Sequence, residues 1–323
     1  MPRIYYTAEG YNGPYLDINT NQEQHILCRK LDLYRSIITV GNPSFFSWKD
    51  VRINGFFRTL SNSVIQKILL VQANIESNQN GMYLHPVFNT YVSDQKRIVS
   101  YNLGMAVAKL YAEKLLNIPN LIHVESLKKV NAITFVNQVD KSKEPDLVGQ
   151  TSNGEWHVFE AKGTSSKYLT TKISEAKEQA RQIQTIHGAN PSTISACATS
   201  FGADKIFTKI VDPPNEKGKE IEIDISKFFD NYYSPFFAMR EASNSSFKTN
   251  KFENIEFNSI DIHTNTLNLT IGIETEVYEL IQEKNFSLLK DYYSKKGNVN
   301  ENFTQENQIS IGLDGFIVKY SNH

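Results

Sequence analysis

Three charged side chains, Asp146, Glu160 and Lys162, are spaced so that a short hairpin would bring them together. Apolar runs at 147–148 and 156–159 flank an Asn-Gly pair, which favours the positive φ angles of a tight turn. Glu160 and Lys162 are two residues apart, so a strand would point both to the same face. A hairpin sets the start of one strand beside the end of the other, and Asp146 is therefore predicted to approach this pair.

Two carboxylates and one ammonium at the margin of a sheet can support metal-assisted hydrolysis. The carboxylates of Asp146 and Glu160, with the main-chain carbonyl of Ala161, form a hard oxygen site that suits Mg²⁺ or Mn²⁺. Such an ion lowers the pKa of a bound water and neutralises charge on a phosphate oxygen. Lys162 beside it can orient the attacking water or stabilise the transition state.

This arrangement resembles a known family. Pro145-Asp146, a hairpin, and then Glu160-Ala161-Lys162 is similar to the motif of the PD-(D/E)XK nuclease superfamily. The resemblance implies the restriction-endonuclease-like fold, an αβββαβ core with a mixed central sheet flanked by helices. It also implies a Mg²⁺-dependent nuclease, with a role in restriction or antiviral defence, that acts on DNA; RNA is not excluded.

Apolar periodicity indicates elements in the order that the resemblance implies. A helix at 101–117 precedes short strands at 121–124 and 132–136 and the hairpin; a helix at 173–186 and a strand at 192–199 follow the hairpin. In the superfamily, the helix before the first core strand often carries an acidic residue that joins the metal site. Glu113 occupies that position here, and the alternative is a solvent-facing glutamate.

The helix after the lysine offers further candidates for contact with the substrate. Some exonuclease-like members carry a glutamine there, and Gln179 resembles it, although Ile183 stands where their Q-x-x-x-Y pattern has tyrosine. Thr164 could bind a phosphate or cap the helix, and Lys172 could contact DNA or belong to a solvated face. His157 has the opposite strand parity to Glu160 and is expected to face away from the site.

Other functional classes remain open beside the nuclease. An E-x-K triplet occurs often by chance on protein surfaces, so its weight comes from the preceding Pro-Asp pair and the hairpin. A non-catalytic subunit could use the same fold to bind nucleic acid or to assemble with partners. A small-molecule α/β enzyme would instead show an apolar pocket away from Glu160.

Composition describes a globular protein with few cysteines. The 323 residues are 40% hydrophobic and 21% charged, and no apolar run is long enough for a membrane span. Two cysteines in separate regions, Cys28 and Cys197, form no metal or disulfide pattern, which suggests a reducing cytoplasm. We therefore expect a cytoplasmic protein without a membrane partner.

Charge and turn signals suggest three regions. Residues 1–98 form an N-terminal α+β region, 99–212 the nuclease core, and 213–323 an acidic α+β module for oligomerisation or for a partner that supplies target recognition. Net charge is +3 over 1–100, +2 over 101–213 and −6 over 214–323, so a nucleic acid should contact the first two. Aromatic and basic residues at 44–60 are either base-stacking groups or core.

Overall fold

A computed structural model of the chain describes residues 2–40, 64–136, 144–215, 218–242, 247–263, 267–297 and 309–321. The centre of the fold is a seven-stranded sheet. Its strands, in order across the sheet, are β2 (Gln24–Leu27), β1 (Arg3–Glu9), β11 (Ile206–Val211), β10 (Thr193–Phe201), β8 (Trp156–Thr164), β7 (Leu147–Gln150) and β5 (Asn120–His123).

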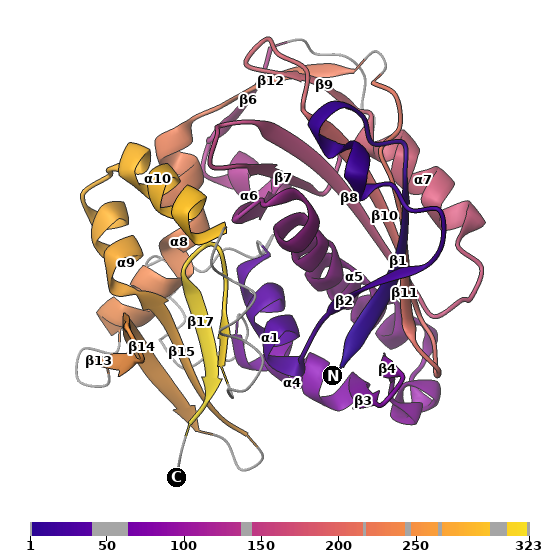
Figure 1. The fold of residues 1–323 in the computed structure, drawn as a ribbon, viewed down its shortest axis with the longest axis horizontal. Helices are drawn as coiled ribbons and strands as arrows, with labels where there is room; N and C mark the ends of the chain where they lie inside the picture. The colour runs from indigo at the N-terminus through magenta and orange to yellow at the C-terminus, as the bar shows by residue number, and fades with distance from the viewer. Residues whose placement is uncertain are drawn as a thin grey trace.

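The sheet is mixed, and helices cover both of its faces. Strand β8 runs parallel to β10 and antiparallel to β7, and β10 runs antiparallel to β11. Helices α5 (Ser93–Leu116) and α7 (Thr170–Ala180) pack on opposite sides of β8 and β10 (Figure 1). Every residue of β7 and β10 is buried, as expected for central strands covered on both faces.

The predicted α/β class, with a mixed sheet flanked by helices, is confirmed. Helix α5 is followed by β5, β7, β8, α7 and β10 in the central sheet, which is the order helix, three strands, helix, strand. The hairpin is also as predicted, because β7 and β8 pair from Leu147 with Phe159 to Gln150 with Trp156. Gly154, at φ +84, supplies the left-handed residue of its turn.

Two predicted core elements are wrong, because each segment pairs with a strand from a distant part of the chain instead of belonging to the core. The strand near 132–136 exists as β6 (Ile133–Phe135), but it pairs with β12 (Lys219–Ile223) in a separate small sheet. The helix predicted to run to Ile186 ends at Ala180, and β9 (Ile183–Ile186) pairs parallel with β12. The apolar spacing of this segment fits a helix as well as a strand, so only the tertiary partner decides.

The last third of the chain forms a second sheet with helices. Its strands, in order, are β13 (Phe247–Phe252), β14 (Ile255–His263), β15 (Asn268–Glu274), β17 (Phe316–Tyr320) and β16 (Ile309–Ile311). Helices α9 (Thr275–Gln282) and α10 (Phe286–Gly297) follow β15. Strands β16 and β17 form a terminal hairpin around Asp314 and Gly315.

A long helix follows the predicted boundary between residues 212 and 213. Helix α8 (Ile225–Ala242) contains Pro235, and proline usually ends a helix because it lacks an N–H and clashes with the preceding turn. Aromatic residues at helical spacing, including Phe229, Tyr233 and Phe236, are buried along one side of α8. Their burial offsets the cost of the proline.

The remaining described elements lie around the central sheet. They are η1 (Gly13–Ile18), α1 (Lys30–Thr39), α4 (Gln66–Asn74), β3 (Ile75–Asn78), β4 (Gly81–Leu84), η3 (Pro86–Thr90) and α6 (Val124–Lys129). The aromatic and basic segment at 44–60 lies outside the described residues. Among the described residues, no helix combines the length and the apolarity needed to cross a membrane.

The three predicted regions do not follow the sheets. Strand β1, from the region 1–98, lies inside the central sheet, where it pairs with β11 of the predicted core. Helix α1 packs between α5 and β17 (Figure 1), so the N-terminal region also contacts the C-terminal sheet. The proposed boundaries therefore cut through packed layers.

Candidate functional site

The β7–β8 hairpin brings Asp146 and Glu160 together, as predicted. The backbone N–H of Asp146 donates to Glu160 Oε2 at 2.9 Å, and the backbone N–H of Ala161 donates to Asp146 Oδ2 at 3.2 Å. These two hydrogen bonds hold the Glu160 carboxylate against the backbone just before β7 and the Asp146 carboxylate against the backbone of β8. Because strand N–H groups lie along the plane of the sheet, the Asp146 carboxylate sits at the sheet margin, beyond the first residue of β7.

Lys162 joins this pair from the same strand. Its ammonium contacts Glu160 Oε1, as the shared strand parity of the two residues predicts. The Glu160 side chain is fully buried, whereas the Lys162 side chain is 22% exposed. Asp146, itself half-buried, and Lys162 are therefore the members of the group that solvent can reach.

Burial and a neighbouring like charge act on Glu160. Burial, and then the negative charge of Asp146, raise the pKa of Glu160 to about 8, although the Lys162 ammonium opposes this shift. Two carboxylates this close stabilise each other's protonated form, unless a cation shares their charge. The arrangement therefore suits a site that binds a cation.

The available ligands fit a metal held mainly by oxygen atoms. The C=O and N–H of one strand residue point to the same side, so the Ala161 carbonyl faces the side on which its N–H meets Asp146. Among the described residues, no group of three or more His, Cys, Asp and Glu side chains could hold a metal. A divalent cation here would use Asp146, Glu160, the Ala161 carbonyl and water, which is a set that Mg²⁺ or Mn²⁺ accepts.

The close crossing of α5 over β8 determines the position of Tyr101 on the helix. A Cβ at Gly163 would lie 1.8 Å from the carbonyl oxygen of Ser100, and a Cβ at Gly104 would lie 2.9 Å from the backbone nitrogen of Gly163. Only glycine allows these backbones to approach so closely. Since Gly163 follows Lys162 and Ser100 precedes Tyr101, the crossing brings Tyr101 near the site.

Tyr101 and His123 are site residues that the sequence analysis missed. The Tyr101 hydroxyl lies 3.1 Å from His123 Nε2 at the end of β5. Burial, followed by the charges of Asp146 and Glu160, raises the pKa of Tyr101 above its ordinary value. Burial lowers the pKa of His123, against the nearby charge of Asp146. The two crossing glycines, Gly104 and Gly163, are the only sequence signal that could have indicated this contact.

The prediction that Glu113 joins the metal site is corrected. Both oxygens of its buried carboxylate accept hydrogen bonds from Arg35, at 2.7 and 2.9 Å. Glu113 is twelve residues beyond Tyr101 on α5, about 18 Å along the helix at 1.5 Å per residue. The helix approaches the site through Tyr101, and Glu113 serves a structural ion pair instead.

Two of the three predicted substrate contacts, Thr164 and Lys172, have local partners in the structure. Thr164 Oγ1 accepts a hydrogen bond from the backbone of Ser166, and Lys172 pairs with Glu175 at 2.8 Å on α7. Gln179 lies in the last turn of α7, which begins after the loop that leaves β8. Their contact with a phosphate stays a prediction, and Gln179 lies farthest along α7 from β8.

His157 lies on the opposite face of β8, as its parity predicts. Its Nδ1 lies 2.9 Å from Thr193 Oγ1, and its Nε2 lies 3.4 Å from the hydroxyl of Tyr15. Burial lowers the pKa of His157 to about 3, so the ring is neutral at pH 7. It is a buried structural histidine.

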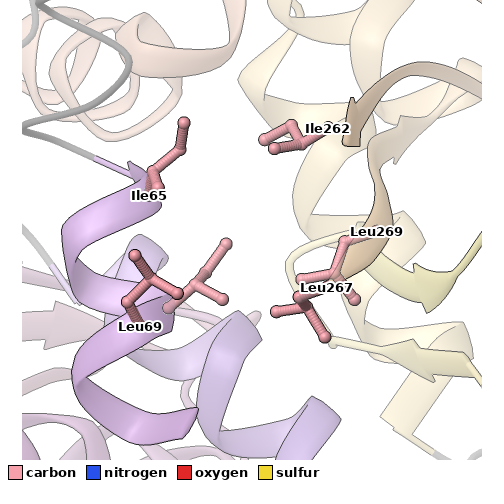
Figure 2. Close-up of a pocket in the computed structure, with 6 residues that line it drawn as sticks. Ile65, Leu69, Ile262, Leu267 and Leu269 are labelled. Atoms are coloured by element: carbon pink, nitrogen blue, oxygen red, sulfur yellow. The ribbon is translucent and has the colours of Figure 1, made fainter. Parts of the chain in front are cut away.

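An apolar pocket lies apart from the charged group. Ile65, which directly precedes α4, and Leu69 of α4 face Ile262, Leu267 and Leu269 across it (Figure 2). All of its lining residues are aliphatic, so it offers no nucleophile, acid or base to a bound molecule. It therefore lacks the polar groups that a small-molecule enzyme would need.

No protein-family model matches the chain, and neither a curated protein nor a solved structure matches it. The function must therefore be argued from the geometry of the charged group at the sheet margin.

Proposed function

We propose that the protein is a Mg²⁺- or Mn²⁺-dependent nuclease that hydrolyses phosphodiester bonds in DNA. The proposal is carried by the convergence of Asp146, Glu160 and Lys162 where β7 and β8 meet the edge of the sheet. The order of the surrounding elements supports a restriction-endonuclease-like core. Resemblance to restriction-type nucleases points to restriction or antiviral defence, with a further copy or a partner protein choosing the target.

Each residue has a distinct role in this proposal. Asp146, Glu160 and the Ala161 carbonyl would hold the ion, which when bound would activate a water and neutralise charge on the phosphate. The Lys162 ammonium favours the ionised form of Glu160, against the burial and the Asp146 charge that raise the pKa of Glu160 to about 8, and a bound cation would favour that form further. The Lys162 side chain is also 22% exposed, so its ammonium can reach a bound phosphate and stabilise the charge that develops during attack.

The test is cleavage of plasmid DNA, linear DNA and RNA by the purified protein with Mg²⁺ or Mn²⁺. Asp146→Ala removes a metal ligand and Lys162→Ala removes the cation, so each should lower the rate at least about 100-fold. Chelation of the metal should abolish cleavage by the wild-type protein.

Lys227→Ala is the matched control, because Lys227 pairs with Asp224 in the acidic last third, where its side chain is 49% exposed. It should cleave as the wild-type protein does. Equal cleavage by Asp146→Ala, Lys162→Ala and the wild-type protein would reject the assigned roles.

A non-catalytic subunit with the same fold is the alternative, and one observation favours it. Both oxygens of Glu160 already have partners, in the backbone of Asp146 and the ammonium of Lys162. A protein of this kind would bind DNA without cleaving it under any of the tested metals. Titration with Mn²⁺ separates the nuclease from the scaffold, since a scaffold whose Glu160 oxygens already have partners is not expected to bind the ion.

A further inference from the structure

We infer that Tyr101 is a further substrate-contacting residue of this site, and that His123 is the positioning residue that turns the Tyr101 hydroxyl hydrogen toward the bound phosphate. The inference rests on the proposed nuclease function and deepens it. It names the group that binds a non-bridging phosphate oxygen from the side of the sheet covered by α5.

The hydrogen-bond partners of His123 define the direction of its bond to Tyr101. His123 Nδ1 accepts a hydrogen bond from the backbone N–H of Glu125 at 3.2 Å, where it caps the start of α6. A nitrogen that accepts from an N–H carries no proton, so the ring proton resides on Nε2. Nε2–H therefore donates to the Tyr101 oxygen, which lies 3.1 Å away.

This arrangement leaves the hydroxyl hydrogen of Tyr101 available to another acceptor. Because the oxygen already accepts from His123, its own O–H must point elsewhere. The Tyr101 side chain is 38% exposed, and the negative charges of Asp146 and Glu160 act on its hydroxyl. A hydroxyl donor on a partly exposed residue beside two carboxylates suits an anionic oxygen held there by a cation.

Side chains from both faces of the sheet approach the margin where Asp146 lies. Glu160 and Lys162 pair with Ala196 and Ala198 of β10, which pack toward α7, whereas Gly163 faces α5. Lys162 thus approaches the margin from one face, and Tyr101 approaches it from the helix that covers the other. A phosphate at the edge, beside the Asp146 carboxylate, would lie between an ammonium and a hydroxyl donor.

Tyr101 acts by hydrogen bonding alone and keeps its proton throughout the reaction. Water attacks phosphorus, the bond from phosphorus to the leaving sugar oxygen breaks, the water loses a proton to solvent, and the leaving oxygen takes one from solvent. The Tyr101 donor stabilises the non-bridging oxygen on which negative charge increases.

The first test is Tyr101→Phe, measured by steady-state cleavage of a DNA duplex with Mg²⁺. A hydrogen bond to a charged group of this kind should reduce kcat by about 10- to 100-fold when it is lost, while KM changes little. Tyr83→Phe, a half-buried tyrosine of β4 outside the site, is the matched control and should match the wild-type kcat.

Two substitutions of His123 separate positioning from folding. Asparagine can replace Nδ1 as the cap of α6 but is too short to reach Tyr101, so His123→Asn should lower kcat nearly as much as Tyr101→Phe. Glutamine can place an amide N–H near the position of Nε2, so His123→Gln should retain more activity despite the weaker cap. The double variant Tyr101→Phe/His123→Asn should lose little beyond Tyr101→Phe alone.

A nitrogen NMR measurement of the histidine rings gives a readout independent of activity. His123, assigned by its loss in His123→Gln, should show the tautomer protonated on Nε2. A proton on Nδ1, or a wild-type kcat in Tyr101→Phe, would overturn the inference while the nuclease proposal survives. If the wild-type protein cleaves neither DNA nor RNA with either metal, the proposed function fails and this role for Tyr101 fails with it.

Discussion

At the scale of single residues, side chains at alternate positions of β8 lie on opposite faces of the sheet and make different contacts. Glu160 and Lys162 form the charged group at the sheet margin, whereas His157, of opposite parity, is buried and bonded to Thr193. A buried neutral histidine makes the free energy of unfolding depend on pH, because the ring binds a proton more tightly in the unfolded chain than in the folded chain. This pH dependence comes from His157 and can be measured by substituting that residue.

His157 should make the protein less stable as the pH falls below about 6.5. The ring has a pKa of about 3 when folded, and it titrates near 6.5 when unfolded. Its contribution is therefore fully present above 6.5 and is lost as the pH falls toward 3, by about 2 kcal/mol at pH 5. Urea unfolding of the wild-type protein and His157→Gln at pH 7 and pH 5 checks this, because the gap between them should shrink at pH 5.

His25→Gln provides the control, since His25 is exposed on β2. The stability gap between this variant and the wild-type protein should be the same at both pH values. An unchanged gap for His157→Gln as well would show that His157 is not a buried neutral ring.

At the scale of elements, the contact between α5 and β8 depends on missing side chains. The backbone of Ser100 occupies the space that a Cβ of Gly163 would need, and Gly104 faces the same strand. Neither backbone can move without shifting a helix or the central strand of the sheet. The crossing therefore sets both the packing of the core and the position of Tyr101.

Gly163→Ala should destabilise the protein by about 3 kcal/mol or more, because the added methyl overlaps backbone rather than a flexible side chain. The comparison variant is Gly188→Ala, where φ is +72 and a Cβ would meet nothing within 4 Å. That change should cost only about 1–2 kcal/mol of left-handed strain. Urea unfolding midpoints measure both, and equal losses would mean that the crossing is looser than the structure indicates.

At the scale of the whole molecule, a buried ion cluster joins the three predicted regions. Arg35 of α1, Lys109 and Glu113 of α5, and Asp314 of the terminal hairpin are all buried, two cations with two anions. Arg35 bonds Glu113 at 2.7 Å, and Lys109 lies 3.6 Å from Asp314. Burial opposes the charge of Glu113, but Arg35 and Lys109 outweigh it and hold the pKa of this carboxyl below its ordinary value.

Arg35→Met should destabilise the whole protein by about 3–5 kcal/mol, since it leaves two buried carboxylates with one cation. Arg97→Met is the control: Arg97 is 80% exposed in a surface pair with Asp94, so it should change stability by less than about 1 kcal/mol. Urea unfolding gives both values. Similar small losses in the two variants would show that the buried cluster does not hold the regions together.

The convergence of Asp146, Glu160 and Lys162 was largely predictable because its determinants are local. The turn, the parity of Glu160 and Lys162, and the length of the hairpin depend on residues within about twenty positions of each other, where strand geometry leaves few alternatives. Asp146 therefore meets Glu160 as the sequence predicts. Apolar periodicity likewise predicts β5, β10 and the end of α5 close to their observed bounds.

Tertiary structure alone decided which distant residues lie beside the charged group and which elements share a sheet. Tyr101 reaches it only because two glycines let α5 touch β8, and His123 only because β5 pairs beside β7. Glu113 is drawn instead to Arg35, seventy-eight positions earlier in the chain. These partners are far apart in sequence, and a buried charge is satisfied by whichever opposite charge the packing brings near, which no local pattern records.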